Sequence, residues 1–314
     1  MTDYCLNGQI TTNAVRRHTL AGTKQIYLIW PETDDKICCL VQWPAGKKED
    51  RMYENYEGRD RKGMVLRMEK AAVYDGEGMR TVVFLKGCPL RCQWCSTPES
   101  QSGKVEVTKD GSITYGKLMT VEEVLVEVRK DSLFYFHSGG GMTLSGGEIL
   151  VQPEFVLALL KRARFEAIHS TIETTFFADW SVVEPILMAV DNVFVDLKIF
   201  DEEKHKRYTG VSNRLILENI RKAGNLRREG TLIVRTPLIP GVNDTEEELE
   251  AMGRFLAELP EVTGLELLPY HRLGTDTYRK LGREYLLKDV EVPSAEHMEW
   301  CRNVVRRHFA RIIE

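Results

Sequence analysis

The chain of 314 residues lacks several features that would assign it to a broad class of proteins. No apolar run approaches the roughly 20 residues that a membrane span needs. The N-terminus has no basic segment followed by an apolar one, which is the pattern of a signal peptide. The net charge is only −4, so charge gives no reason to expect nucleic-acid binding. These absences predict a cytoplasmic protein with no membrane or nucleic-acid partner.

The chain has seven cysteines but lacks a second pair of metal-binding spacing. Cys88, Cys92 and Cys95 form a CxxxCxxC motif, and no cysteine lies between Cys95 and Cys301. A structural zinc site usually takes four ligands in two pairs, and a disulfide would leave one thiol over. Three thiolates on one loop can instead bind three irons of a [4Fe-4S] cluster and leave the fourth iron open. The spacing favours this open cluster, with zinc and a disulfide as alternatives.

From about residue 80 onward, short apolar runs alternate with amphipathic stretches. The runs predict strands at 81–86, 142–145, 168–173, 193–198, 232–237 and 265–268. Several are almost wholly apolar, as in a parallel sheet that is buried on both faces. Because eight β/α units typically take about 250 residues, six units predict an α/β fold with a partial (β/α)6 barrel of the TIM type. Such a fold carries its functional residues at the C-terminal ends of the strands.

Local signals mark where the intervening helices begin. Thr120 and Glu123 form a capping-box pair, and Pro153 suits a first helical residue. Asp244 is expected to cap a helix that contains Leu249 and Leu259, and Ser294 is expected to cap the last helix. The buried face of that last helix is predicted to contain Met298, Cys301, Val305 and Ile312.

Residues 1–62 do not follow the β/α alternation and are predicted to form a small β-rich extension before a barrel domain of residues 63–314. Strands are expected at Gln25–Trp30 and Lys36–Trp43. Cys38 and Cys39 are neighbours and would point to opposite faces of a strand. We therefore expect them to pack rather than to bind a metal together.

The segment DGEGMRTVVFLKGCPLRCQWCSTPESQ closely resembles the radical S-adenosylmethionine (SAM) family. Within that family it is most similar to the glycyl radical enzyme activases, such as the pyruvate formate-lyase activating enzyme. The likeness continues through GGGMTLSGGE, FVDLKIFDEEKHKRYTGVSN, RTPLIPGVND and LLPYHRLG, over roughly residues 62–285.

The resemblance implies a reaction. Family members bind SAM on the open iron of one [4Fe-4S] cluster, and one electron cleaves SAM to methionine and a 5′-deoxyadenosyl radical. In the activases, this radical takes a hydrogen atom from a glycine of a partner glycyl radical enzyme. Flavodoxin or ferredoxin is the expected electron donor.

The resemblance also implies site residues. The SAM amino group is expected at the strand-end sequence Ser145-Gly146-Gly147-Glu148 and at Asp196. The SAM carboxylate is expected at Lys198, which the resemblance groups with the three cysteines as catalytic.

Four further positions match the family's cofactor site. Glu173 and Thr174 stand where relatives often have Asp-Thr, which in some members lies beside a monovalent cation. His271 matches a histidine near the ribose, and Arg235 is expected to reach the SAM pocket. Trp94 is expected to pack at the adenine or to cover the cluster.

The chain departs from the family in two places. Many relatives carry two ferredoxin-like clusters after the CxxxCxxC loop, but here a short stretch without cysteine, Ser100–Lys117, fills that place. The family's DGPG is Asp75-Gly76-Glu77-Gly78 in this chain.

The sequence leaves two other functions open. One is a radical SAM enzyme that modifies a small molecule or peptide, and the other is a non-enzymatic iron–sulfur or zinc scaffold. The sequence does not identify the partner enzyme.

Overall fold

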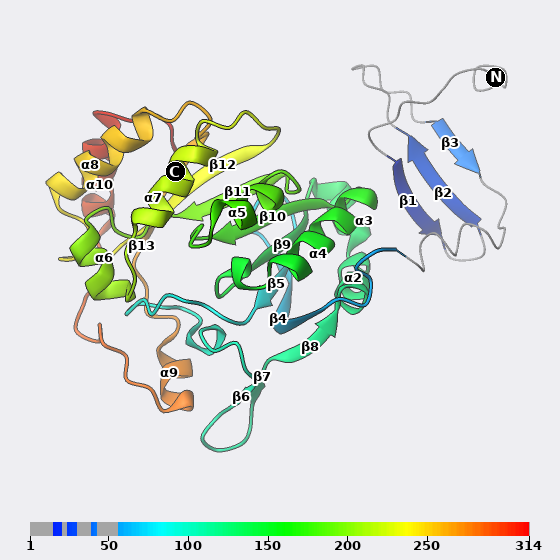
Figure 1. The fold of residues 1–314 in the computed structure, drawn as a ribbon, viewed down its shortest axis with the longest axis horizontal. Helices are drawn as coiled ribbons and strands as arrows, with labels where there is room; N and C mark the ends of the chain where they lie inside the picture. The colour runs from blue at the N-terminus through cyan, green and yellow to red at the C-terminus, as the bar shows by residue number, and fades with distance from the viewer. Residues whose placement is uncertain (1–14, 21–23, 30–38, 43–55, 314) are drawn as a thin grey trace.

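The computed structural model describes residues 15–20, 24–29, 39–42 and 56–313 (Figure 1). Its main sheet has, within these residues, the strand order β14-β13-β12-β11-β10-β9-β5-β4-β8. The parallel part of the sheet consists of β5 (Arg80–Leu85), β9 (Gly141–Gly146), β10 (His169–Thr174), β11 (Asn192–Asp196), β12 (Thr231–Leu238), β13 (Gly264–Pro269) and β14 (Ile312–Ile313). All six predicted parallel strands are therefore confirmed.

The sequence did not predict the antiparallel edge of this sheet. The long strand β4 (Lys62–Ala72) pairs antiparallel with β5 on one side and with β8 (Lys117–Thr120) on the other. A short hairpin of β6 (Glu106–Val107) and β7 (Thr114–Tyr115) precedes β8. In the described residues β14 and β8 are the two ends of the sheet and do not pair, so the barrel is partial, as predicted.

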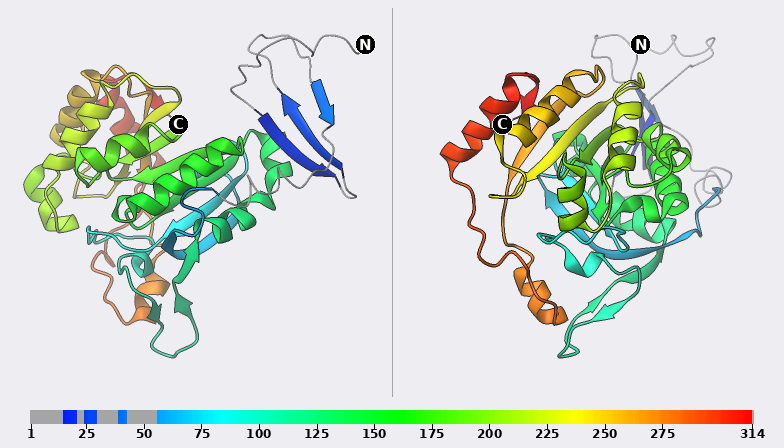
Figure 2. Two further views of the ribbon diagram at one scale, coloured as in Figure 1. Left: turned by 45° about the vertical axis from the view of Figure 1, so that its right-hand side comes forward. Right: turned by 60° about the vertical axis from the view of Figure 1, so that its left-hand side comes forward.

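Helices lie between the strands of the sheet (Figures 1 and 2). They are α2 (Val121–Arg129), α3 (Ser132–Ser138), α4 (Pro153–Phe165), α5 (Trp180–Leu187), α6 (Glu202–Thr209), α7 (Arg214–Ala223), α8 (Glu246–Ala257), α9 (Thr275–Leu281) and α10 (Ala295–Arg306). Of these, α2, α4, α5, α7, α8 and α10 pack on the outer face of the sheet, whereas α9 lies near the cysteine loop. Single 3-10 turns follow β5 and β9, at η1 (Pro98–Ser100) and η2 (Ile149–Val151). None of the helices in the described part of the chain is both long and apolar enough to cross a membrane.

Three of the four predicted helix starts are confirmed. Thr120 and Glu123 form the complete capping box of α2, and Pro153 is the first residue of α4. Ser294 caps α10 by accepting a hydrogen bond from the backbone of His297.

Two details of the helix predictions are wrong. Thr245, not Asp244, caps α8, because the Thr245 side chain accepts the hydrogen bond from Glu248 N. The Asp244 carboxylate instead accepts from Gly241 N at 2.8 Å. Ile312 lies beyond the end of α10, in the edge strand β14.

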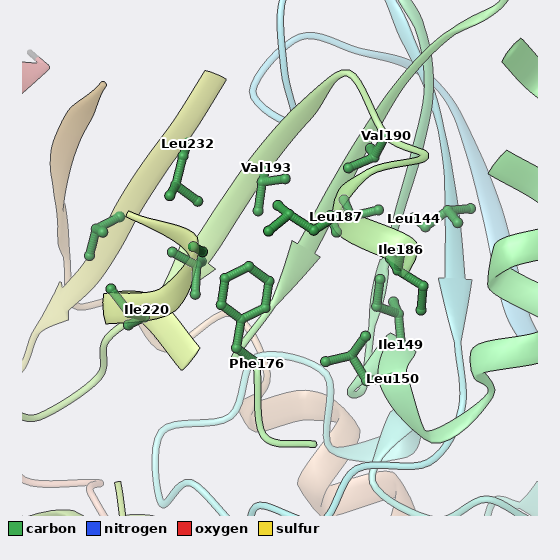
Figure 3. Close-up of a cluster of buried hydrophobic side chains, with 14 of the residues drawn as sticks. Leu144, Ile149, Leu150, Phe176, Ile186, Leu187, Val190, Val193, Ile220 and Leu232 are labelled. Carbon is green, nitrogen blue, oxygen red and sulfur yellow. The ribbon is translucent and has the colours of Figure 1, made fainter. Parts of the chain in front are cut away.

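Alternation along the strands separates the core from the barrel interior. In β11, Val193 and Val195 are fully buried under the helices, whereas Phe194 and Asp196 point to the opposite side. Strand β12 alternates in the same way. The core between sheet and helices includes Phe176 and Ile220, which pack beside Val193 (Figure 3). The polar residues of the strands are therefore collected on the inner face.

The described parts of the N-terminal extension form a three-stranded antiparallel sheet of β1 (Val15–Leu20), β2 (Lys24–Ile29) and β3 (Cys39–Gln42). Strand β2 matches the first predicted strand, and β3 matches the second in part. The rest of that second prediction, with Cys38, lies outside the described residues. Strand β1 was not predicted, and the domain division after residue 62 stays a prediction.

Candidate active site

A cavity of about 310 Å³ opens at the C-terminal ends of the parallel strands, within the usual size range of roughly 300–1,000 Å³ for small-ligand pockets. Thirteen of the fourteen predicted site residues line it. They are Cys88, Cys92, Trp94, Cys95, Ser145, Gly146, Gly147, Glu173, Thr174, Asp196, Lys198, Arg235 and His271. The fold thus brings together side chains from six strand ends and from the cysteine loop.

The cysteine loop follows β5 and is held by backbone hydrogen bonds. Cys88 N donates to Gln101 O at 3.1 Å, and Cys95 N donates to Cys92 O at 3.2 Å. All three cysteines carry free thiols. Burial raises the pKa of each, that of Cys92 to about 12. An iron centre would offset the cost of burying the thiolates, because metal ligation stabilises the deprotonated form.

The three cysteines do not form a site for a single metal ion. In the described residues no three His, Cys, Asp or Glu side chains converge closely enough to hold one metal ion. A [4Fe-4S] cluster needs no such convergence, since each cysteine binds a different iron. Trp94, within the loop, is only 7% exposed and packs against Tyr208 with 6.4 Å between ring centroids.

At the end of β9, Gly146 and Gly147 leave no room for a side chain, because neighbouring backbone packs against them. Gly146 has a positive φ of 109°, which favours glycine. A Cβ on Gly147 would lie 2.2 Å from Gly87 O and 3.1 Å from Ser100 O. The backbone of this turn therefore packs directly on the backbone that leads into Cys88.

Glu148 is the one predicted site residue that does not line the cavity. Its carboxylate is fully buried and accepts hydrogen bonds from Thr174 Oγ1 at 2.6 Å, Thr175 N at 2.8 Å and Leu150 N at 3.1 Å. Burial raises the pKa of Glu148, and these hydrogen bonds act against that rise. In this geometry the side chain holds the end of β10 in place.

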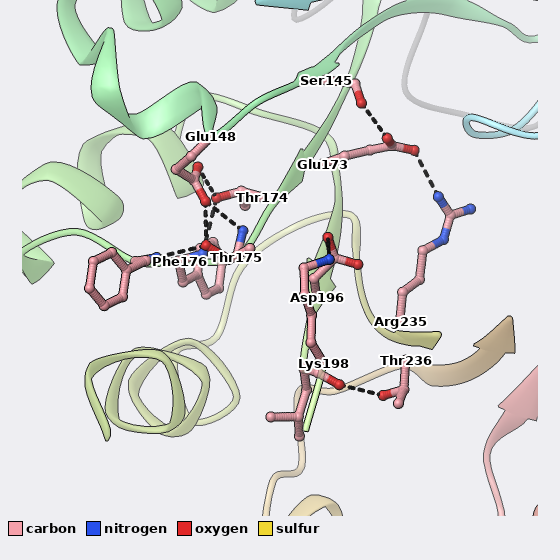
Figure 4. Close-up of polar contacts among 12 residues, drawn as sticks. Ser145, Glu148, Glu173, Thr174, Thr175, Phe176, Asp196, Lys198, Arg235 and Thr236 are labelled. Atoms are coloured by element: carbon pink, nitrogen blue, oxygen red, sulfur yellow. Dashed lines mark hydrogen bonds and ion pairs between the residues drawn. The ribbon is translucent and has the colours of Figure 1, made fainter. Parts of the chain in front are cut away.

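A layer of charged side chains covers the inner face of β10 to β13 (Figure 4). Arg235 donates to Glu173 Oε1 at 2.7 Å and to Glu266 Oε2 at 2.6 Å, and Ser145 Oγ donates to the other oxygen of Glu173 at 2.5 Å. Lys198 Nζ lies 3.0 Å from Asp196 Oδ2.

Burial and neighbouring charges shift the ionisation of this layer. Burial raises the pKa of Glu173, although the charge of Arg235 acts in the opposite direction. Burial alone would lower the pKa of Lys198, but the nearby Asp196 and Cys92 together raise it, so Lys198 stays charged. His271 is neutral near pH 7, because burial lowers its pKa below the ordinary value.

Sequence reasoning missed two charged residues near this site. Asp75 lines the cavity from the loop between β4 and β5, and burial raises its pKa. Glu266 lies on β13 and contacts Arg235. A charge in an apolar strand needs a partner, so the sequence Leu265-Glu266-Leu267 carried a signal for Glu266.

Comparison with known proteins relates this geometry to a family. Residues 82–256, more than half of the chain, match the model of the Radical SAM superfamily. The isethionate sulfite-lyase activating enzyme of Oleidesulfovibrio alaskensis is 42% identical over 287 residues, which cover 75% of this chain and 92% of that relative. The (2S)-3-sulfopropanediol sulfolyase activating enzyme of Bilophila wadsworthia is 36% identical over 286 residues, with 76% and 94% covered.

A solved structure supports the fold alone. A radical SAM methyltransferase from Sphaerobacter thermophilus aligns with a TM-score of 0.53 at 15% identity, over 79% of this chain and 76% of that chain. Family membership and activity rest on the sequence relatives. The chain belongs to the radical SAM superfamily and, within it, to the activating enzymes of glycyl radical enzymes.

Proposed function

We propose that Cys88, Cys92 and Cys95 hold the [4Fe-4S] cluster of this activating enzyme and that the adjoining cavity binds SAM at the open iron. The observation that supports these assignments is the convergence of three thiols and six strand ends on one cavity. When bound, the cluster supplies the electron that cleaves SAM. The protein's residues bind and orient SAM and keep water away from it.

The pair formed by Lys198 and Asp196 is the proposed receptor for the amino-acid end of SAM. The Lys198 ammonium and the Asp196 carboxylate are 3.0 Å apart. Together they are complementary to a ligand that carries a carboxylate and an ammonium group close to each other. Lys198 would bind the SAM carboxylate, and Asp196 the amino group. Ser145, Gly146 and Gly147 would supply polar backbone and hydroxyl groups beside it.

The remaining cavity residues would position the nucleoside. His271 is neutral, and its Nδ1 accepts a hydrogen bond from Leu273 N at 3.4 Å, so Nε2 can donate to a ribose hydroxyl. Trp94 would cover the cluster and pack near the adenine. Glu148, which the sequence assigns to the SAM amino group, would act indirectly, through Thr174 and Thr175.

The partner is proposed to be a glycyl radical enzyme that acts on a sulfonate. This proposal rests on relatives whose names specify isethionate sulfite-lyase, at 42% and 40% identity, and sulfopropanediol sulfolyase, at 36% identity. Flavodoxin or ferredoxin is the proposed electron donor, and the cytoplasm, which keeps thiols reduced, the proposed location.

The partner can be tested directly without oxygen. The reconstituted protein is mixed with SAM, a reductant and either isethionate sulfite-lyase or trans-4-hydroxy-L-proline dehydratase. We expect a glycine-centred electron paramagnetic resonance doublet, with matching activity, for the sulfite-lyase. If the dehydratase gives a doublet with a yield equal to or greater than that of the sulfite-lyase, the sulfonate class is rejected and the activase function is retained. If both enzymes stay silent while a small molecule is modified, the activase assignment itself is wrong.

A further inference from the structure

Arg235 occupies an unusual position for a charged side chain. It lies on the inner face of β12, is only 12% exposed, and its guanidinium group lies 3.3 Å from the ring centroid of Phe194 on β11. From there it reaches across β11 to Glu173 on β10 and sideways to Glu266 on β13. Its third contact is with Tyr74 O at 3.1 Å, in the loop before Asp75.

The strand register explains this reach. Glu173 lies opposite Phe194, and Arg235 lies between Asp196 and Glu266. A guanidinium that leaves β12 therefore passes over the Phe194 ring and meets the Glu173 carboxylate. Figure 4 shows Glu173 held between Ser145 and Arg235.

By the family resemblance, a monovalent cation lies in some members beside the positions that correspond to Glu173 and Thr174, next to which Asp196 stands on the neighbouring strand. Each of these side chains already has a hydrogen-bond partner within this protein. Both oxygens of Glu173 accept, from Arg235 and Ser145. Thr174 Oγ1 donates to Glu148, and Asp196 accepts from Lys198. The chain itself therefore supplies a positive charge at Glu173, where Arg235 donates to Oε1 at 2.7 Å, and an alkali ion beside that carboxylate would be repelled by the like charge of the guanidinium.

We propose that the Arg235 guanidinium takes the place of that monovalent cation, so that SAM binding in this enzyme needs no alkali ion. The inference rests on the proposed SAM site. A guanidinium carries the same single positive charge and keeps it at every pH relevant to the protein. Unlike an ion, it is fixed by the chain and cannot exchange.

This proposal also accounts for glutamate at position 173. Relatives often have aspartate there, and glutamate is longer by one methylene group. The longer side chain brings one carboxylate oxygen to Arg235 and the other to Ser145. Arg235 is a positioning residue in this view, because it acts on SAM through Glu173 and the charge of the layer.

The test measures SAM affinity of the cluster-loaded protein by calorimetry and by the change in the cluster's electron paramagnetic resonance spectrum. Binding is compared in potassium chloride and in tetramethylammonium chloride at equal ionic strength. We expect the wild-type dissociation constants in the two salts to agree within about twofold. A large loss of wild-type affinity without alkali ions would overturn the role of Arg235 and leave the SAM site intact.

Substitutions at Arg235 and Glu173 test the same proposal from the side of the protein. Arg235→Gln should weaken SAM binding about tenfold or more, because Glu173 loses a charged hydrogen-bond donor. In Glu173→Asp/Arg235→Gln, which shortens the carboxylate and removes the guanidinium, potassium should restore affinity where tetramethylammonium does not. Arg254→Gln, an exposed change on α8, is the matched control and should behave as wild type in both salts.

The outcomes separate the two levels of the proposal. No SAM binding to the cluster-loaded wild type in either salt would reject the proposed SAM site. Unchanged, salt-independent affinity in Arg235→Gln would reject only the guanidinium as a cation substitute. The wild-type salt comparison needs no variant, so it decides the question even if the substituted proteins do not fold.

Discussion

At the scale of single residues, a carboxylate can shape a binding site without contacting the ligand. Glu148 ends the Gly-Gly-Glu turn, yet its side chain is buried against Thr174 and Thr175. An isolated charge there would be costly, but hydrogen bonds from four donors, on Leu150, Thr174 and Thr175, offset the desolvation. The residue therefore links the turn after β9 to the end of β10.

This role predicts a stability defect in addition to any loss of SAM affinity. Glu148→Ala leaves several buried donors without an acceptor, each at a cost of about 1–3 kcal/mol. The free energy of unfolding, measured by urea denaturation of the cluster-free protein, should therefore fall. Glu247→Ala, on the first turn of α8, is the surface control. If Glu148→Ala unfolds like that control, the buried carboxylate has no such role.

The cluster cysteines give a second residue-scale prediction. Anaerobically reconstituted wild-type protein should hold about four irons per chain. Cys88→Ala, Cys92→Ala and Cys95→Ala should each lose the cluster, as measured by iron and sulfide content. Cys301→Ala should retain it, because that thiol is buried within α10. Loss of iron from a folded Cys301 variant would contradict a single cluster site.

Lys198 gives a third prediction at the scale of single residues. Lys198→Ala should weaken SAM binding by about 1.5–3 kcal/mol, because the SAM carboxylate loses a charge-assisted hydrogen bond. Asp196 would also be left without its partner beside that carboxylate. The measurement is calorimetry on the cluster-loaded protein. Lys222→Ala, which removes an exposed i,i+4 pair with Glu218, is the control. Equal SAM affinity in both variants would remove Lys198 from the site.

At the scale of elements, the parallel strands were predictable because a strand buried on both faces must be almost wholly apolar. The exceptions to that pattern, such as Asp196 in β11 and Arg235 in β12, marked the inner face. The resemblance then supplied their chemistry. Strand β4, which lies between β5 and the edge strand β8, was missed because it is half-exposed, with the irregular burial of a bulged strand.

Contacts between distant elements were not predictable from the sequence. The sequence Gly-Gly-Glu does not reveal that the Glu148 carboxylate turns toward β10. A carboxylate that pointed into the cavity would have the same sequence. The same holds for Arg235, whose three partners come from β10, β13 and the loop before β5. Side-chain direction depends on packing that forms only when the strands are assembled.

The contact between the β9 turn and the cysteine loop can be tested at this scale. Gly147→Ala would place a methyl group against the backbone of Gly87 and Ser100, and that backbone holds the start of the cysteine loop. We expect reduced iron incorporation, measured per folded chain. Gly103→Ala is the matched control, because its Cβ would meet nothing nearer than 3.9 Å. Full incorporation by Gly147→Ala would show that the loop tolerates the shift.

At the scale of the whole molecule, the matched part of the chain is shorter than the corresponding part of its relative. The match to the Oleidesulfovibrio alaskensis relative is 287 positions long but uses 75% of 314 residues, or about 236, so about 50 positions have no residue here. After the cysteine loop, the β6–β7 hairpin is held by Glu106, which pairs with the buried Lys86 and with Arg283. These two ion pairs thus hold a compact hairpin after the cysteine loop.

The open barrel fits a substrate that is itself a polypeptide. Because β14 and β8 do not pair in the described chain, the sheet does not close, whereas a closed barrel of this size is filled by side chains. Exposed apolar side chains stand near the cavity, with Tyr74 87% and Leu273 80% exposed. Tyr74 precedes Asp75 and Leu273 follows His271, both of which line the cavity.

A polypeptide substrate predicts the fate of one hydrogen atom. When the partner enzyme carries deuterium at the α-carbon of its radical-forming glycine, the C–D bond broken there should reappear as a C–D bond in 5′-deoxyadenosine. Mass spectrometry of the nucleoside measures this transfer, and the glycyl radical should form in equal amount. The partner with that glycine changed to alanine is the control and should give no labelled product. Unlabelled 5′-deoxyadenosine formed together with a modified small molecule would instead identify a metabolite as the hydrogen donor.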